Sequence, residues 1–191
     1  MKLYTIASAI LALAAPVAFA QTSAWKADSA HSEVDFSVKH LAISNVRGHF
    51  GKVDVTINLD EKDITKSSVK ATIDVSGVNT GEDARDNHLK TDAFFDVAKF
   101  PTATFTSTSV AKTGSGLTVN GNLTLHGVTK PVVLTIDGPT APITGMDKKQ
   151  HVGFSATTTL HRSDFGVGGS IPTAVVGDDV QLTIDLDAAK Q

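Results

Sequence analysis

Seven histidines are the first candidates for chemistry, because an imidazole can ligate a metal ion or transfer a proton. They stand at positions 31, 40, 49, 88, 126, 151 and 161. No two of them have the i, i+2 or i, i+4 spacing of a typical metal-binding motif. We therefore expect no metal site. By strand parity, His126, His151 and His161 are expected on the outer surface.

Two glycine-containing motifs could indicate an enzyme, but neither has the context that its chemistry requires. Gly153–Thr157 resembles the start of a nucleophile elbow, yet it lacks the final Gly and falls inside a predicted strand. Gly166–Gly169 follows no parallel strand and opens no helix, so it is a loop that needs positive φ angles rather than a dinucleotide site. The absence of cysteine excludes disulfides, thiol nucleophiles and thiolate metal sites. We expect no enzymatic activity and no catalytic residue.

The charged run at residues 82–88 has two readings. It is either the solvated face of a helix or a polar rim at which Arg85 and His88 meet an anionic or carbonyl headgroup. Arginine suits the second role because its guanidinium can form two parallel hydrogen bonds with a carboxylate or phosphate. Both readings stay open at this point.

Arg162 has the inward parity of its predicted strand, and an inward arginine is costly unless it is paired. Its expected partner is Asp164, Asp86 or a bound ligand, and a structural Arg–Asp pair is the favoured reading. His40 stands at the end of another strand with inward parity, which is a position suited to the mouth of a barrel. The predicted headgroup rim consists of His40, Arg85, His88, Arg162 and Asp164.

Apolar and polar residues alternate along most of the chain, which is typical of strands in a sheet with one buried face. The predicted strands cover residues 33–39, 53–59, 69–75, 102–110, 117–125, 132–136, 152–160 and 180–186. Eight strands of this kind suit a closed antiparallel barrel or a two-sheet sandwich. We favour the barrel because closure removes exposed sheet edges. The expected fold class is all-β.

The segment between the third and fourth predicted strands breaks the alternation. Thr80 resembles a helix cap with Asp83 three residues later, which predicts a short helix through Leu89 or Lys90. An aromatic stretch follows at residues 94–100. Apolar insertions of this kind tend to cover a barrel, so we expect this segment to close one end.

Several inward positions carry small residues, namely Ala71, Gly121, Ala156 and Thr158. Small inward residues leave volume inside a barrel of eight strands, and they favour a cavity over a filled core. The predicted lining consists of Phe36, Val38, Val55, Ile57, Ile73, Val75, Phe94, Phe95, Phe105, Leu123, Leu125, Phe154 and Phe165.

Residues 1–20 are predicted to be a signal peptide that is cleaved after Ala20. Lys2 supplies the positive charge, and an apolar run of about ten residues ends at Pro16. A short membrane anchor is the alternative, but a spanning helix needs about 20 apolar residues. Residues 21–191 would then form one domain in the periplasm, and release beyond the cell stays open.

The formal charge of −3 becomes −4 once a leader with one Lys and no acid is removed. This mild acidity argues against nucleic acid as a partner and against anchoring on anionic lipid headgroups.

Several long motifs occur in order along nearly the whole mature chain. They are Trp25 to His40, Thr80 to Lys90, Phe94 to Pro101, Leu123 to Pro131 and Arg162 to Val167. In these segments the chain closely resembles the YceI-like family of bacterial exported lipid-binding proteins, which are also called polyisoprenoid-binding proteins.

This resemblance implies an eight-stranded, lipocalin-like barrel with a hydrophobic lumen. It also implies a carrier of isoprenoid-tailed or other long-chain amphiphiles, such as an isoprenoid quinone, a polyprenyl phosphate or a fatty amide. The family suggests no catalytic residue, cofactor or obligatory metal; homodimers occur among relatives, and transient membrane contact is compatible with this role. The alternatives are an exported enzyme that acts on an amphiphile and a filled barrel that serves as a scaffold or adhesion protein.

Overall fold

The computed structural model describes residues 22–114 and 116–191, so the predicted signal peptide lies outside the described residues. Strands dominate this part of the chain. They are β1 (Thr22–Ala27), β2 (Glu33–His40), β3 (Ser44–His49), β4 (Val53–Asp60), β5 (Ser68–Asp74), β6 (Thr102–Thr113), β7 (Gly116–Leu125), β8 (Val128–Asp137), β9 (Ile143–Thr144), β10 (Gln150–His161) and β11 (Val176–Lys190). The helices are α1 (Asp83–Leu89) and two short 3₁₀ helices, η1 (Ile64–Lys66) and η2 (Arg162–Phe165).

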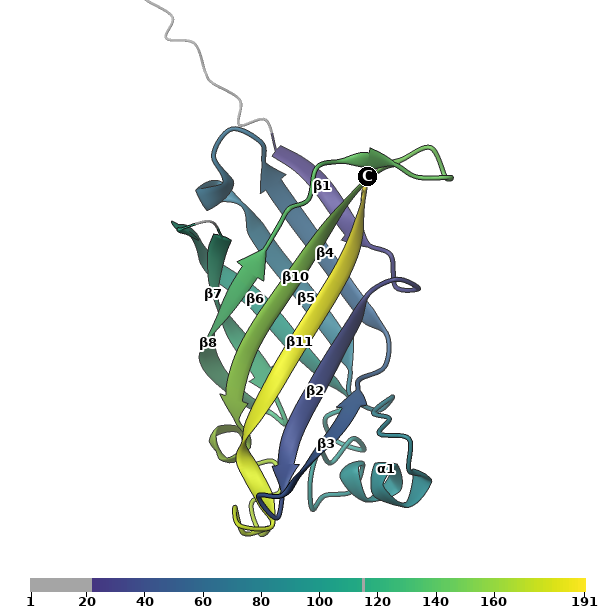
Figure 1. Cartoon of the computed structure of the whole chain (residues 1–191), viewed down its shortest axis with the longest axis vertical. Coiled ribbons are helices and arrows are strands. Elements are labelled where there is room, and N and C mark those ends of the chain that lie inside the picture. Colours follow the sequence, from purple (N-terminus) through teal and green to yellow (C-terminus); the bar gives the residue numbers. More distant parts are fainter. Residues whose placement is uncertain (1–21, 115) are drawn as a thin grey trace, which may run out of the picture.

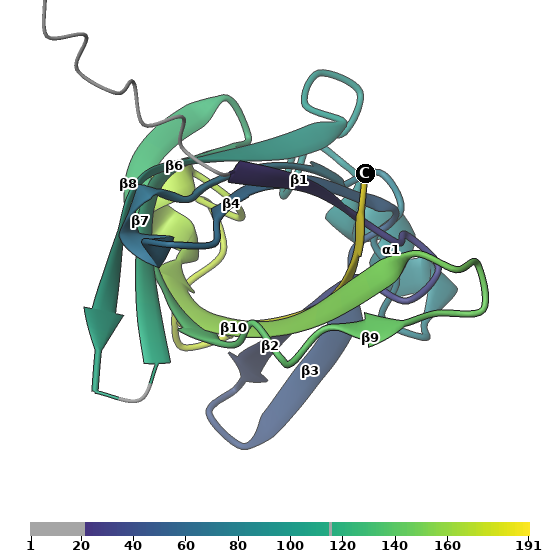
Figure 2. The same ribbon diagram turned by 90° about the horizontal axis from the view of Figure 1, so that it is seen from above.

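Eight strands close into a barrel in the order β1, β4, β5, β6, β7, β8, β10 and β11, and every pairing is antiparallel (Figures 1 and 2). The ring closes where β11 pairs with β1, at Trp25 opposite Lys190 and Ala27 opposite Ala188. The remainder of β11 pairs with β2, which continues the wall from the end of β1. The predicted closed eight-stranded antiparallel barrel is confirmed.

Seven of the eight predicted ranges lie within strands, and the range 69–75 runs one residue past the end of β5. The sequence patterns missed β1, β3 and β9. β1 buries only Trp25 and Ala27, which is too few positions to establish an alternation. β3 has Val46 as its single large apolar residue, and β9 is two residues long. The closed ring contains β1, which was not predicted. The predicted strand β2 lies outside this ring and pairs with the part of β11 that extends beyond β1.

The predicted helix between β5 and β6 is present as α1, and it ends at Leu89 as expected. Its cap is Glu82 rather than Thr80, so the predicted cap was wrong. The Thr80 hydroxyl and backbone N–H both donate to Asp86 instead, because the buried Asp86 carboxylate needs donors. Among the described residues, no helix combines the length and the apolar character needed to cross a membrane.

Not all of the small inward residues border free space in the barrel. Ala71, Ala156 and Thr158 face the interior of the barrel and leave space beside them, as predicted. Gly121 does not, because a Cβ atom there would overlap the ring of Phe105. Phe105 fills the space that parity alone assigned to a cavity.

Candidate functional site

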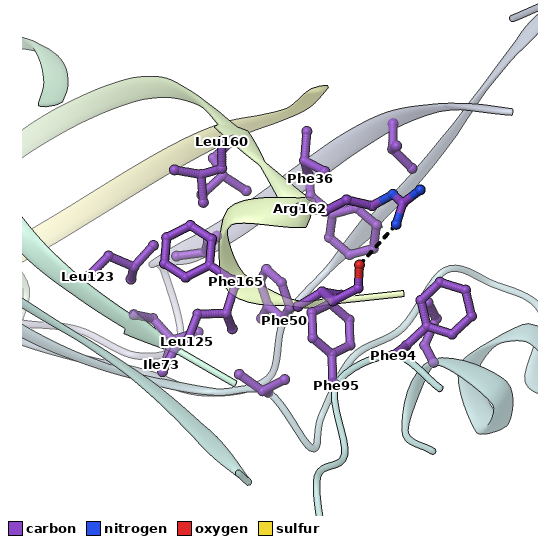
Figure 3. Close-up of a pocket in the computed structure, with 18 of the residues that line it drawn as sticks. Phe36, Phe50, Ile73, Phe94, Phe95, Leu123, Leu125, Leu160, Arg162 and Phe165 are labelled. Carbon is purple, nitrogen blue, oxygen red and sulfur yellow. Dashed lines mark hydrogen bonds between the residues drawn. The ribbon is translucent and has the colours of Figure 1, made fainter. Parts of the chain in front are cut away.

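The barrel interior is a lumen in two adjoining compartments. The lower compartment, near α1, has a free volume between its atoms of about 860 Å³, with open solvent at its mouth included (Figure 3). The upper compartment has about 1050 Å³ on the same measure and reaches Leu59 and Ile64 at the other end of the barrel. Both compartments share the side chains of Val34, Ile73, Leu123 and Leu182, which we call the waist.

All thirteen predicted lining residues lie on the lumen wall. The upper compartment contains Val55, Ile57, Phe105 and Phe154; the lower one contains Phe36, Val38, Val75, Phe94, Phe95, Leu125 and Phe165; Ile73 and Leu123 touch both. Those on strands lie there because inward positions carry the apolar half of the alternation. Val75, Phe94, Phe95 and Phe165 come instead from the segments that follow β5, α1 and β10. That these residues hold a ligand stays a prediction.

The wall is apolar almost throughout. Ser67 and Thr158 line the upper compartment and Arg162 lines the lower one, but all three present only apolar atoms to the lumen. The described side chains that line the lumen include no carboxylate and no imidazole. The lumen can therefore bury an apolar chain, but its own wall supplies no general acid or base.

Aromatic rings narrow the lower compartment. Phe50 packs against Phe36 with ring centroids 5.3 Å apart and against Phe95 at 5.7 Å (Figure 3). Phe94 and Phe95 belong to the aromatic stretch that was expected to close one end, and both line this compartment. Phe50 was missed because it lies in the link between β3 and β4, where no alternation marks an inward position.

Arg162 is 6% exposed and pairs with no carboxylate in the described part of the chain, so the expected Arg–Asp pair is wrong. Its five N–H groups donate to five backbone carbonyl oxygens, those of Gly177 (3.1 Å, from Nε), Val167 (3.0 Å) and Gly168 (2.6 Å) from Nη1, and Ile171 (2.8 Å) and Val176 (2.9 Å) from Nη2. These bonds hold the loop between η2 and β11 across the lower end. The guanidinium has no N–H left for a headgroup.

Neither of the two aspartates proposed as partners of Arg162 contacts its guanidinium. Asp164 is exposed on η2, and Asp86 accepts from Thr80. Arg162 therefore satisfies its charge through carbonyl dipoles, which no sequence pattern reveals. Gly166 and Gly168 adopt positive φ angles of 68° and 64°, as predicted for this loop, and so turn the carbonyls toward the guanidinium.

Three of the predicted rim residues, His40, Arg85 and His88, surround one hollow at the lower end of the barrel, which we call the mouth. The mouth has a free volume of about 770 Å³, with the open solvent in front of it included. It shares side chains with the lower compartment, namely Phe36, Val38, Leu89, Phe94 and Val176. The mouth therefore adjoins the apolar lumen.

Arg85 is oriented by Thr80. Its Nε donates to the Thr80 hydroxyl at 2.7 Å, and its Nη2 donates to the Thr80 carbonyl at 3.0 Å. Within residues 22–114 and 116–191 its Nη1 makes no hydrogen bond. His88 is exposed and packs edge-on against Phe94, with ring centroids 5.0 Å apart. The mouth thus combines an apolar floor with a cation that retains donors.

A separate carboxylate–imidazole cluster lies on the outer surface near the upper end. His31 Nδ1 is 2.9 Å from Asp28, and His151 contacts Asp187 at 2.6 Å and Asp147 at 3.1 Å. The hydrogen bond to Asp28 raises the pKa of His31, and the hydrogen bond to Asp187 is the largest cause of the raised pKa of His151. The His31–Asp28 pair lies within the turn after β1, whereas His151 joins β10 to β11 and to the loop before β10. The Asp28 N–H donates to the Asp187 carbonyl at 2.7 Å and so holds the turn against β11, outside the lumen.

The spacing of histidines along the chain gave no hint of this cluster. Three potential metal-ligand atoms lie within 4.8 Å of one another, one each from Asp28, His31 and Asp187. They converge only because the β1–β2 turn packs against the distant end of β11.

The sequence model of the YceI-like domain matches residues 25–188. "Protein YceI" of Salmonella newport (strain SL254) is 38% identical over 165 residues, which cover 84% of this chain and 83% of that protein.

Solved structures show the same barrel. BcnA of Burkholderia cenocepacia has a TM-score of 0.74 at 26% identity and covers 84% of this chain and 98% of its own. The YceI protein of Campylobacter jejuni has a TM-score of 0.72 at 31% identity, with coverage of 100% and 99%. A polyisoprenoid-binding domain from Saccharophagus degradans has a TM-score of 0.64 at 19% identity, with coverage of 88% and 99%.

The family match begins within β1 and ends within β11, and it includes every strand between them and the loop that Arg162 holds. The resemblance seen in the sequence motifs is confirmed. On these grounds the chain belongs to the family of YceI-like domain proteins.

Proposed function

We propose that this protein is an exported lipid carrier that holds the tail of an isoprenoid-tailed or other long-chain amphiphile in its barrel. The observation that carries the proposal is the apolar lumen, whose two compartments adjoin at the waist. The structural neighbour that is a polyisoprenoid-binding domain supports a ligand of this class.

The energetics favour tail recognition over headgroup recognition. Each buried methylene contributes about 0.8 kcal/mol, so ten of them contribute about 8 kcal/mol. This is comparable to the cost of lost translational and rotational freedom on association. Selectivity among tails of similar length is therefore expected to be loose.

We place the headgroup at the mouth. A tail inserted into the lower compartment leaves its polar end beside Arg85, His88 and His40. Arg85 Nη1 can donate to a phosphate or quinone oxygen while Nε and Nη2 stay on Thr80. An isoprenoid quinone or a polyprenyl phosphate has this combination of tail and head.

Periplasmic residence, transient membrane contact and self-association into dimers are further parts of the proposal. The predicted leader at residues 1–20 supports export. A free isoprenoid tail is insoluble in the aqueous space between two membranes, and an enclosing barrel keeps it from water.

The decisive experiment is purification from the native periplasm followed by mass spectrometry of co-purified lipid. Wild-type protein should carry an unmodified long-chain lipid, whereas a folded Phe154→Asp variant should carry none because the charge would lie in the upper compartment. Thr157→Asp is the matched control, since Thr157 is on the same strand and exposed on the outer face.

Three results would contradict the proposal. A folded Phe154→Asp protein that still retains lipid would show that the tail does not occupy the upper compartment. Wild-type protein without any lipid would favour the filled-barrel scaffold. Turnover of an added amphiphile, blocked by a single polar substitution, would favour the enzyme.

A further inference from the structure

Two loops project together at the lower end of the barrel (Figure 1). Both expose apolar side chains. They are the β2–β3 turn, Leu41–Ile43, and the segment Pro172–Val175 before β11, and we call them the apolar tip. The Leu41 N–H donates to the Val175 carbonyl at 2.9 Å, which holds the loops side by side. Ile43 is 83% exposed, Leu41 49% and Val175 38%.

The backbone of the turn makes these residue types unusual. Leu41 and Ala42 have φ angles of 50° and 59°. Two consecutive left-handed residues in a hairpin turn favour Asn, Asp or Gly. Leucine at such a position lowers stability and also exposes an apolar side chain, so neither folding nor solubility accounts for it.

The apolar tip lies at the mouth. Val175 lines the mouth together with His40, the residue immediately before the turn. Five side chains of the mouth also line the lower compartment. A surface that covered the tip would therefore face the entrance of the lumen.

The charges beside the tip favour an anionic surface. Neither loop of the tip contains a charged residue, and the exposed Lys39 and Arg47 flank the turn on β2 and β3. The acids that follow the second loop are engaged: Asp178 accepts from Ser163, and Asp179 lies 2.9 Å from His161. Glu82 and Asp83 are exposed at the start of α1 and would repel an anionic surface. Attraction to such a surface therefore has to come from the two cations of the β2–β3 hairpin.

The opposite end of the barrel provides a contrast. Ile143 and Met146 are also exposed there, but Asp147, Lys148 and Lys149 follow them directly. At that end, the exposed apolar side chains are followed by both negatively and positively charged residues.

We propose that the apolar tip is a membrane-docking surface. Leu41, Ile43 and Val175 insert into the interface of an anionic bilayer, Lys39 and Arg47 face its headgroups, and the mouth is brought against the lipid. The negative charge of the whole chain opposes firm anchoring, so the contact is reversible. The inference deepens the proposed carrier function and rests on it, since it names the surface through which a lipid would be exchanged.

The test is partitioning of the full mature protein onto vesicles, measured by flotation. One set contains phosphatidylcholine and phosphatidylglycerol in equal parts, and the other contains phosphatidylcholine alone. Leu41→Asp/Ile43→Asp should lower partitioning onto the anionic vesicles at least about tenfold, because two apolar side chains no longer insert. Ile143→Asp/Met146→Asp is the matched control at the opposite end and should partition like wild type.

A second variant tests the electrostatic part. Lys39→Gln/Arg47→Gln should weaken binding to the anionic vesicles and leave the weak binding to phosphatidylcholine unchanged. Equal losses on both vesicle types would contradict the role of these two cations.

The outcomes separate docking from lipid carriage. Phe154→Asp should lose its internal lipid and still bind vesicles, because the tip is intact. Wild-type partitioning by the tip variant, or an equal loss in the control pair, would overturn the docking proposal even if lipid still co-purifies. A tip variant that dissociates a dimer, together with wild-type protein that ignores vesicles, would show that the tip contacts a second copy of this chain.

Discussion

Obstruction of the waist should divide the lumen into two. Ile73 lies on β5 and lines both compartments. Ile73→Trp places a larger side chain between them, whereas Ile73→Leu preserves the volume and serves as the control. If a tail passes the waist, the tryptophan variant should bind only the part that fits in the lower compartment.

The magnitude follows from the methylenes that are excluded. Each buried methylene contributes about 0.8 kcal/mol, or roughly fourfold in Kd. The upper compartment follows β4 from Val53 to Leu59, a rise of about 20 Å along the strand, which is ample for four methylenes. If four methylenes of the tail were no longer buried, binding would weaken by about 3 kcal/mol, or roughly 200-fold in Kd.

The assay is a chain-length series of single-tailed amphiphiles, with Kd measured for each length by calorimetry. For wild type and Ile73→Leu, affinity should rise until the tail fills both compartments. For Ile73→Trp, it should reach a plateau at the length that fills the lower compartment. Parallel rises for wild type and the tryptophan variant would refute a tail that crosses the waist.

The same variant tests whether the barrel is filled. Extra volume in a packed core costs about 1–3 kcal/mol, whereas extra volume in an open lumen costs less. We expect the free energy of unfolding of Ile73→Trp to fall by less than about 1 kcal/mol. A larger loss would favour the filled-barrel scaffold.

Three other perturbations have defined outcomes. Arg162→Lys should lower the free energy of unfolding in urea by about 3 kcal/mol or more, because a lysine cannot replace five hydrogen bonds to carbonyls; unchanged stability with loss of lipid would make Arg162 a ligand contact instead. Gly121→Ala should cost about 1–3 kcal/mol through its clash with Phe105, and Phe105→Leu should reduce that cost, which thermal unfolding of the double variant would reveal. His151→Gln should destabilise the fold mainly at low pH: Asp187 raises the pKa of His151, so the stabilisation is full below the ordinary histidine value of 6.5 and is lost as pH rises through the raised pKa. An equal loss at pH 5.5 and pH 8.5 would contradict this ion pair.

The wall of the lumen could be predicted because alternation along a strand encodes which side chains face inward. This information is local, so the positions from Phe36 on β2 to Phe154 on β10 needed no knowledge of the strand order. The same reasoning failed for β1, whose two buried residues are too few for a pattern. It also failed for Phe50, which is placed by a link between strands.

The polar groups were harder to predict, because their partners are not specified locally. Parity correctly showed that Arg162 points inward, but its partners are backbone carbonyls, which every residue has. Gly121 was also correctly inward, yet only the register with β6 shows that Phe105 occupies the space beside it. His31 and Asp187 approach each other from opposite ends of the sequence.

The seam between β1 and β11 sets the order in which the barrel can form. Trp25 and Lys190, which pair across it, are 165 positions apart, whereas β6, β7 and β8 pair with their sequence neighbours. Long-range pairing is slow because the intervening chain must first be brought together. Until β11 arrives, β1 and β10 each present an unpaired edge to which a strand of another chain could add. The lumen thus comes into existence in one late step, and a chain with either end still held elsewhere, in a translocation channel for example, would have no enclosed space to fill.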